Sequence, residues 1–492
     1  MMTAFEPGHL VMVDIPGKQL DAATANFLRE HRIRAVCLFR KNLGSEDEIR
    51  ALTRDLREAM GERALIGIDQ EGGSVIRATS VPQAPAAMAL GALDDELLAE
   101  EVGAAVARGL RGLGINWNFA PVLDVNNNPA NPVIGERSFG EDPERVTRLA
   151  RAWMRGSLRE GVACCVKHFP GHGDTHVDSH HALPHVDKTL EELEALELRP
   201  FAALAAEAPA MMTAHIVYPQ IDPDHPATLS HPILTGILRE RLGFGGVIIT
   251  DALMMKAVYD RYGHARAAVL ALQAGADMPL AQGSLDEQGA TLAAIREVLA
   301  DGSLALDTVL AARARLDRLA EAYPLATRDY APAQRAADDA LMHRAWGAAL
   351  SALRGATPPA ATRKLRVITQ ADVASDGVSE AGLPIERVAA LFAGFADVEI
   401  LRHPNLRRIE AVDTPVDDRL NVLVSNQRGR YFAGARGAKV DLHLAIWNPF
   451  QVLDHAAPAV ITWGYADGAM QALKAWLEGR QPATAQPPVT LE

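Results

Sequence analysis

Short apolar runs alternate with longer amphipathic segments along the first two-thirds of the chain. The runs lack strict polar–apolar alternation, which is typical of parallel strands buried on both faces. They cover residues 10–15, 35–39, 64–68, 115–125, 163–166, 210–216, 247–250 and 274–279. Segments with helical periodicity lie between them, among them 46–60, 94–113, 144–160, 190–206 and 262–273. Eight strand–helix pairs in about 330 residues predict an α/β fold, a (β/α)8 TIM-like barrel, with an open doubly wound sheet as the alternative.

A second, smaller α/β domain is predicted after the barrel. The segment 355–362, Gly-Ala-Thr-Pro-Pro-Ala-Ala-Thr, is typical of a linker. Further apolar runs follow at 365–369, 398–401, 420–424, 440–447 and 460–463. We therefore expect a catalytic barrel at 1–335, a helix and linker at 336–363, a C-terminal α/β domain at 364–480 and a flexible tail at 481–492. The second domain carries no evident catalytic group, so its expected role is to cover a barrel face or to support assembly.

Charge and cysteine content narrow the class of protein. The 492 residues carry a formal net charge of −13, which argues against nucleic acid or an anionic membrane surface as the main partner. The three cysteines, Cys37, Cys164 and Cys165, form neither a disulfide framework nor a CxxC motif. The first residues lack a signal-peptide pattern, and no long apolar stretch suggests a membrane span. These features predict a cytoplasmic protein.

Polar residues stand at the ends of the apolar runs. The positions are Asp69, Asp124, Lys167, His168, His215, Asp251 and Asp277. Enzymes with a parallel barrel build their active sites at the carboxyl ends of the strands. This clustering therefore predicts a site at that end of the barrel.

The segment 167–185 is the richest in candidate chemistry. It holds six of the sixteen histidines of the chain, and its glycines and prolines predict a loop. A metal site is one interpretation, but aligning His172, His176 and His180 would require a helix. Acid–base catalysis is the other, because Asp178 and His180 are two residues apart and point to the same side of an extended backbone.

Asp251 is the second anchor of the predicted site. It follows the apolar strand at 247–250 and precedes Ala-Leu-Met-Met. A carboxylate in such surroundings is costly unless it is paired or used in chemistry. On the residues alone, it could cap the next helix or act as a nucleophile.

Several motifs together resemble glycoside hydrolase family 3, in the branch of bacterial β-N-acetylglucosaminidases (β-N-acetylhexosaminidases) of the NagZ type. The resemblance covers about residues 8–320, and the motif in the histidine-rich loop is the most specific. The matching motifs are Lys167-His-Phe-Pro-Gly-His-Gly-Asp174, Asp178-Ser-His180, Gly67-Ile-Asp-Gln-Glu-Gly-Gly73, Asn118-Phe-Ala-Pro-Val-Leu-Asp-Val125, Asn131-Pro-Val-Ile-Gly-Glu-Arg-Ser-Phe139 and Met212-Thr-Ala-His-Ile-Val-Tyr-Pro219.

The resemblance implies a retaining mechanism. Asp251 is then the nucleophile that forms a covalent glycosyl-enzyme, and His180, oriented by Asp178, is the acid/base. This pair departs from the two carboxylates that most glycosidases use. The residues implied to bind the sugar are Asp69, Arg77, Arg137, Lys167 and His168. Those implied to lie behind them are Asp124, Asp174 and His215.

The implied activity is exo-acting removal of terminal β-linked N-acetylglucosamine, from cell-wall muropeptides or other small saccharides, without cofactor or metal. The histidine acid/base carries this substrate assignment, because it is characteristic of that branch. A phosphorylase releasing N-acetylglucosamine 1-phosphate and a β-glucosidase of the same family stay as alternatives. A metal-dependent hydrolase using the histidine-rich loop is the alternative from another class.

Overall fold

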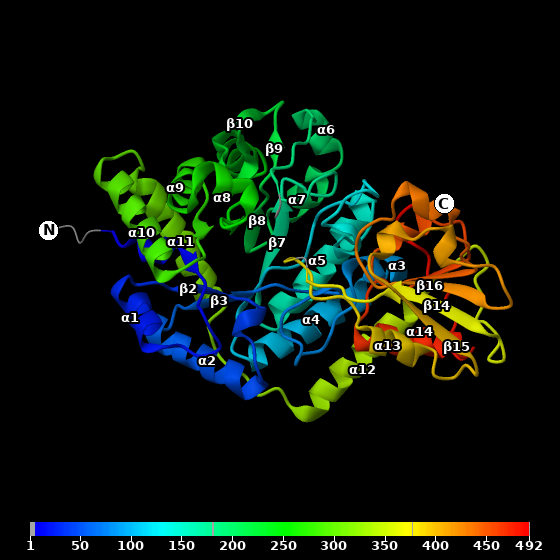
Figure 1. Ribbon diagram of the computed structural model, residues 1–492. Helices are drawn as coiled ribbons and strands as arrows, with labels where there is room; N and C mark the ends of the chain where they lie inside the picture. Colours follow the sequence, from blue (N-terminus) through cyan, green and yellow to red (C-terminus); the bar gives the residue numbers. More distant parts are fainter. Residues whose placement is uncertain (1–4, 180–181, 376, 492) are drawn as a thin grey trace.

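The computed structural model describes residues 5–179, 182–375 and 377–491, and it contains two α/β units (Figure 1). The N-terminal unit is a closed parallel barrel, so the predicted fold class is confirmed. Its strand order is β1-β12-β11-β8-β7-β6-β3-β2, and pairing of Met12 with Leu280 closes it. The strands are β1 (Met12–Val13), β2 (Ala35–Leu38), β3 (Leu65–Ile68), β6 (Trp117–Asn118), β7 (Ala163–Phe169), β8 (Ala210–Thr213), β11 (Val247–Ala252) and β12 (Met278–Leu280).

Helices surround the barrel and bury one face against it. In α2 (Glu46–Met60), Ser45 and Glu48 form a capping box, and Ile49, Leu52 and Leu56 face the strands. The other helices of this unit are α1 (Ala22–Glu30), α3 (Ala87–Leu93), α4 (Glu96–Gly112), α5 (Pro143–Arg159), α6 (Leu190–Ala195), α7 (Leu198–Leu204), α8 (Lys256–Tyr262), α9 (His264–Ala274), α10 (Leu285–Ala300) and α11 (Leu306–Ala322).

One expected helix is interrupted. The sequence predicts a single helix at 190–206, whereas the structure has α6 and α7 with a break at Leu196. Leu196 adopts φ −136° and ψ −77°, which is outside the helical region. Pro200 lies in the first turn of α7, where its missing N–H costs no helical hydrogen bond.

The C-terminal unit is a six-stranded sheet covered by helices. Its order is β13-β18-β17-β16-β14-β15, and only the β13–β18 pair is antiparallel. Trp346 of the connecting helix lies fully buried in its core. The elements are α12 (Pro332–Ala348), β13 (Ser351–Leu353), β14 (Leu365–Gln370), α13 (Ile385–Leu391), β15 (Val398–His403), β16 (Leu420–Ser425), β17 (Leu442–Ala445), β18 (Ala459–Ile461) and α14 (Asp467–Leu477).

Two segments differ from the expected domain plan. The expected linker contains β13, whose Ser351 pairs with Ile461 of β18. The expected flexible tail is packed over residues 481–491: Ala483 accepts a hydrogen bond from the amide of Ala352, and Leu491 is only 3% exposed. Leu353 of the first segment and Val489 and Leu491 of the second belong to the apolar core of the C-terminal unit. Composition alone does not reveal these distant partners.

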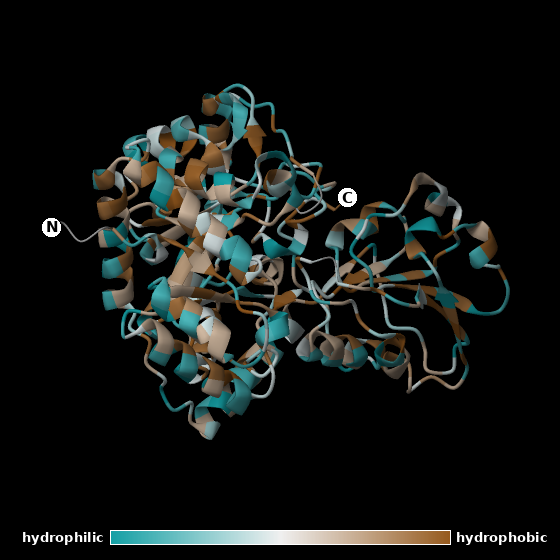
Figure 2. Ribbon diagram, turned by 60° about the vertical axis from the view of Figure 1, so that its left-hand side comes forward, coloured by the Kyte–Doolittle hydropathy of each residue, from teal (hydrophilic) through white to brown (hydrophobic). Residues whose placement is uncertain are grey.

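Apolar residues gather along the strands, and polar residues dominate the outer helix faces (Figure 2). Within the residues that the structure describes, every helix is too short or too polar to cross a membrane. Small antiparallel hairpins lie at the carboxyl end of the barrel, after β3 and after β8. They are β4 (Gln70–Gly72) with β5 (Val75–Ile76), and β9 (Val217–Tyr218) with β10 (Asp222–Pro226).

Candidate active site

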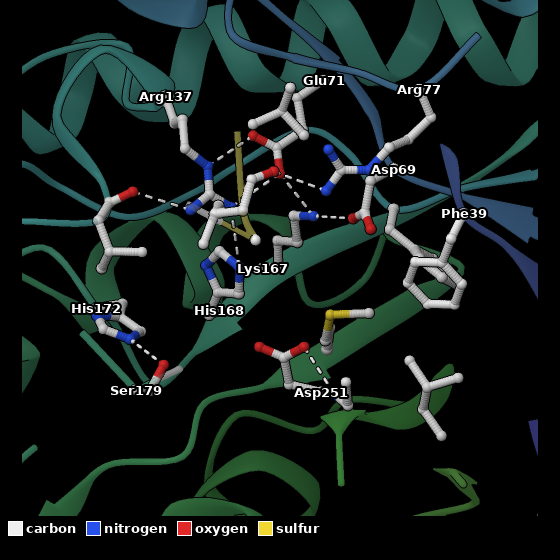
Figure 3. Close-up of a pocket in the computed structure, with 18 residues that line it drawn as sticks. Phe39, Asp69, Glu71, Arg77, Arg137, Lys167, His168, His172, Ser179 and Asp251 are labelled. Atoms are coloured by element: carbon white, nitrogen blue, oxygen red, sulfur yellow. Dashed lines mark hydrogen bonds and ion pairs between the residues drawn. The ribbon is translucent and has the colours of Figure 1, made fainter. Parts of the chain in front are cut away.

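A pocket that opens to solvent lies at the carboxyl ends of the barrel strands (Figure 3). Six of the residues predicted for the site line it together: Asp69, Arg77, Arg137, Lys167, His168 and Asp251. They come from the ends of β3, β7 and β11 and from two loops, and the barrel brings them together from across almost 200 residues. Their positions agree with a common site, and their individual roles stay predictions.

Four charged groups form a compact cluster on one side of the pocket. Lys167 Nζ lies 2.6 Å from Asp69 Oδ1 and 2.7 Å from Glu71 Oε1. Arg137 donates through Nε and Nη2 to the two oxygens of Glu71, both at 2.9 Å. Such a two-point pair fixes the plane of the guanidinium group.

Neighbouring charges set the protonation of this cluster. Burial works to raise the pKa of Glu71, but Arg137 and Lys167 hold it well below its usual range. Burial likewise works to lower the pKa of Lys167, and Asp69 and Glu71 raise it above its ordinary value. At neutral pH Glu71 is therefore a carboxylate held between the two cations Arg137 and Lys167.

His168 has a defined orientation because Asp124 lies behind it. The Nδ1 atom of His168 lies 2.7 Å from Asp124 Oδ2, and Arg137 Nη2 lies 3.3 Å from Nε2. These partners favour the tautomer with the proton on Nδ1, which leaves Nε2 as an acceptor. Burial works to raise the pKa of Asp124, and the neighbouring His168 lowers it overall.

Asp251 extends from the end of β11 on the opposite side of the pocket from the charged cluster (Figure 3). Its Oδ1 accepts a hydrogen bond of 2.7 Å from the amide of Ala252. His215 is fully buried beneath this strand end, with Nε2 3.0 Å from the carbonyl oxygen of Ala252 and Nδ1 2.8 Å from Thr228 Oγ1. His215 thus holds the backbone that carries Asp251.

The loop after β7 is fastened to the barrel over its first half. Asn131 Nδ2 donates to the carbonyl oxygens of His172 (2.8 Å) and Gly173 (3.0 Å). Residue 173 must be glycine, because a Cβ there would lie 1.7 Å from the carbonyl oxygen of Val125. Ser179 Oγ, at the pocket, lies 3.1 Å from His172 Nε2.

The predicted acid/base lies outside the described residues. Residue 180 is among those that the structure does not describe, so the expected contact between Asp178 and His180 is not tested. Asp178 is partly exposed and its carbonyl oxygen accepts from the amide of Ala182. Asp174 lies 2.7 Å from Lys188 Nζ, away from the pocket lining.

Two strand-end residues differ from the simple expectation. Asp277 precedes β12, and it accepts hydrogen bonds from Arg315 (2.8 Å) and the amide of Ile248 (2.7 Å), so it is structural. Arg77 lines the pocket, but its Nη1 lies 2.8 Å from Glu380 and its Nη2 donates to the carbonyl oxygen of Val378 at 2.7 Å. Both partners belong to the C-terminal unit.

The residues predicted for the sugar site did not include Glu71, His172, Ser179 or Val378, which the structure places at the pocket. Glu71 is two residues after Asp69, and this spacing in extended backbone could have indicated a shared direction. Val378 is about 300 residues from its barrel partner Arg77, so no local sequence pattern predicts that it lies at the pocket.

Metal-binding geometry is not evident in the part of the chain that the structure describes. There, no three His, Cys, Asp or Glu side chains converge as ligands for a metal ion would. His172 is held by Thr175 and Ser179 instead. Burial, aided by His168, lowers the pKa of His172 to about 4, so its imidazole is neutral at pH 7.

Residues 4–319 match the N-terminal domain of glycosyl hydrolase family 3. The chain belongs to glycoside hydrolase family 3. As a member, it shares 41% identity over 293 residues with the beta-hexosaminidase of Chromobacterium violaceum, covering 58% of this chain and 82% of that enzyme. It is 39% identical over 282 residues to beta-hexosaminidase A of Pseudoalteromonas piscicida, but the match spans 52% of this chain and only 47% of that protein.

A solved structure resembles this family 3 chain across both units. A glycoside hydrolase family 3 beta-N-acetylglucosaminidase from Paenibacillus sp. str. FPU-7 superposes with a TM-score of 0.86 at 31% identity. The superposition covers 100% of this chain and 99% of that one. The two-domain arrangement is therefore shared with a protein of that description.

Proposed function

We propose that this family 3 enzyme is a retaining, exo-acting β-N-acetylglucosaminidase. The observation that carries the proposal is the pocket in which Asp251, at a strand end, faces a cluster of fixed charges around Lys167 and Arg137. The names of the relatives at about 40% identity, all beta-hexosaminidases, support the same class of terminal sugar. Cell-wall muropeptides are the proposed natural substrates.

The charged cluster is suited to bind the hydroxyl groups of one terminal sugar. Asp69 accepts from paired hydroxyls, and Lys167 keeps one of its three N–H donors beyond the two that Asp69 and Glu71 use. His168 lies beside Arg137, and its Nε2 atom, 3.3 Å from Arg137 Nη2, helps to orient that guanidinium group. These groups hold their positions before substrate arrives, which lowers the entropic cost of binding.

In the proposed reaction, a carboxylate oxygen of Asp251 attacks the anomeric carbon while the bond to the leaving oxygen breaks. His180, oriented by Asp178, gives its proton to that oxygen. The same imidazole then takes a proton from water, whose oxygen displaces Asp251 and releases the sugar with retained configuration. Asn131 fastens the base of the loop that carries the proposed acid/base.

Turnover of an aryl β-N-acetylglucosaminide tests this function. We expect the wild-type enzyme to release N-acetylglucosamine, with the rate unchanged by a chelator, and Asp251→Ala to lose at least about 10³-fold in kcat because the nucleophile is gone. Asp260→Ala, an exposed aspartate on α8, is the matched control and should retain full activity. A mechanism-based fluorosugar should label Asp251, and labelling of another side chain would contradict the assignment.

The same assay shows whether water or phosphate accepts the glycosyl group. Hydrolysis gives free N-acetylglucosamine in both phosphate and phosphate-free buffer. Appearance of N-acetylglucosamine 1-phosphate as the main product in phosphate buffer would instead identify a phosphorylase.

A further inference from the structure

The C-terminal domain reaches into the sugar pocket of the barrel. Gly377 and Val378, in the loop that follows β14, line the pocket together with the barrel residues. In the sheet, β14 lies between β16 and β15, so the chain leaves β14 and β16 in opposite directions at this point. Open α/β sheets bind ligands in the crevice at such a reversal, at the carboxyl ends of the strands. Loops from this crevice contact the barrel, through residues 377–380 and Arg428.

The segment 377–380 is fastened to the barrel by directed polar contacts. Arg77 donates to Glu380 and to the carbonyl oxygen of Val378, at 2.8 and 2.7 Å. The amide of Glu380 donates to the carbonyl oxygen of Ser74 at 3.0 Å. These contacts fix both the side chain and the backbone of the segment against the β4–β5 hairpin.

A second fastening comes from the loop after β16. Arg428 Nη1 lies 3.2 Å from Ser379 Oγ, and Nη2 of the same guanidinium donates to the carbonyl oxygen of Val133. Arg137 also donates to that Val133 oxygen, at 3.0 Å. The segment is thus tied to the same stretch of backbone that orients Arg137.

Val378 completes a small apolar surface in an otherwise charged pocket. It packs with Val75, Val133 and Ile134 in a separate apolar cluster, and it is only 5% exposed. Val75, Val133 and Val378 all line the pocket. The charge of Glu380 is neutralised by Arg77. The side chain that the segment places at the pocket, that of Val378, is apolar.

We propose that the segment 377–380 is a specificity-determining wall for the terminal sugar, latched by the Arg77–Glu380 ion pair. The proposal rests on the proposed function and names the part of the substrate that the C-terminal domain recognises. The wall contacts a C–H face of the sugar ring, because the side chain that it places at the pocket, that of Val378, is apolar. It contacts the terminal sugar and not the leaving group.

Glu380→Gln tests the latch, with Glu386→Gln, an exposed glutamate of α13, as the matched control. We expect Glu380→Gln to raise KM about tenfold, with kcat changed less than about twofold, since a charge-assisted bond holds the wall. The inhibition constant of free N-acetylglucosamine should rise by the same factor. The rise should be equal for an aryl glycoside and a disaccharide substrate. Val378→Ala, which keeps the latch, should shift the same constants in the same direction.

The outcomes are distinct. If the wild-type enzyme is active and both Glu380→Gln and Val378→Ala leave KM and the inhibition constant unchanged, the proposed role of the segment is wrong. A change that depends on the leaving group while the inhibition constant of the free sugar stays constant would equally contradict that role. A lowered melting temperature without these changes would indicate a purely structural segment and also overturn it. Failure of the proposed function would appear differently, as absence of turnover in the wild-type and Glu386→Gln enzymes alike.

Discussion

Glu71 holds two buried cations in place at the heart of the pocket. Its side chain is 7% exposed, that of Arg137 is 5% exposed and that of Lys167 is 2% exposed. Two cations this close are tolerated because a carboxylate lies between them. Asp124 has a comparable role behind His168, where it decides which ring nitrogen carries the proton.

Replacing Glu71 by Gln should damage both stability and activity. The amide keeps the shape but leaves Arg137 and Lys167 unbalanced, and removing one partner of a buried pair costs about 3–5 kcal/mol. We expect a lower free energy of unfolding in urea titrations and at least about a tenfold loss in kcat/KM. Glu191→Gln, an exposed glutamate of α6, is the control. Unchanged stability would show that the cluster is not electrostatically coupled.

Replacing Asp124 by Asn should reduce activity with little loss of binding-site shape. Asn turns an N–H toward His168 Nδ1, so the proton moves to Nε2, where it opposes Arg137. A bond to a charged group contributes about 1.5–3 kcal/mol, so we expect kcat/KM to fall about 10- to 100-fold. Steady-state kinetics measure it, with the exposed Asp286→Asn of α10 as reference. Full activity would contradict the tautomer assignment.

At the scale of elements, the base of the loop after β7 is fastened by the side chain of Asn131. The Oδ1 atom of Asn131 also accepts from the amides of Val133 (2.9 Å) and Ile134 (2.7 Å). One side chain therefore joins this loop to the segment that leads to Arg137.

Asn131→Ala should release the base of the loop. We expect kcat to fall at least about tenfold while KM changes less, because the proposed proton donor loses its position, whereas Glu71 still holds Arg137 and Lys167. Steady-state measurements of kcat and KM, together with burst kinetics, show whether the variant affects kcat more than KM. Asn26→Ala, on the exposed face of α1, serves as control. An equal rise in KM without a loss in kcat would argue against a positioning role.

At the scale of the whole molecule, the two units share a polar and apolar seam. Trp447 Nε1 donates to Glu136 at 2.9 Å, and Ser74 Oγ donates to the same oxygen at 2.7 Å. Arg108 of α4 pairs with Asp338 of α12 at 2.7 Å. The C-terminal unit also buries His443 and His455, whose rings pack against Tyr431.

These two histidines should make the molecule sensitive to acid. Burial lowers the pKa of His455 to about 4 and that of His443 well below its ordinary value, so both are neutral when folded. An unfolded histidine titrates near 6.5, so below that pH the unfolded chain binds protons that the folded one does not. Stability is therefore constant above about pH 7 and falls with decreasing pH, by about 2 kcal/mol per histidine at pH 5.

Calorimetry between pH 7.5 and 5 measures this dependence. His455→Gln should reduce the fall in melting temperature by the contribution of one histidine. His343→Gln, at an exposed histidine of α12, should leave the fall unchanged. A His455→Gln curve parallel to the wild-type curve would show that His455 takes up its proton in the folded state.

Much of the fold followed from local pattern. Each of the eight apolar runs of the first unit overlaps a barrel strand. Asp69, Lys167 and Asp251 lie at the pocket because strand ends of a parallel barrel converge. The packing of residues 481–491 and the strand β13 were not foreseeable, because their partners are distant in sequence. Glu71 was within reach of spacing arguments, whereas Val378 and Glu380 were not.

The sequence by itself determined the order of strands and helices, the barrel and the chemical groups available at its rim, because hydrophobic period and strand-end position are local properties. Only the tertiary structure decided which charges neutralise each other and that Arg77 belongs to an ion pair between domains. It also decided that Gly377 and Val378 of the second domain line the pocket. Those outcomes depend on distances between residues hundreds of positions apart, and no local pattern encodes them.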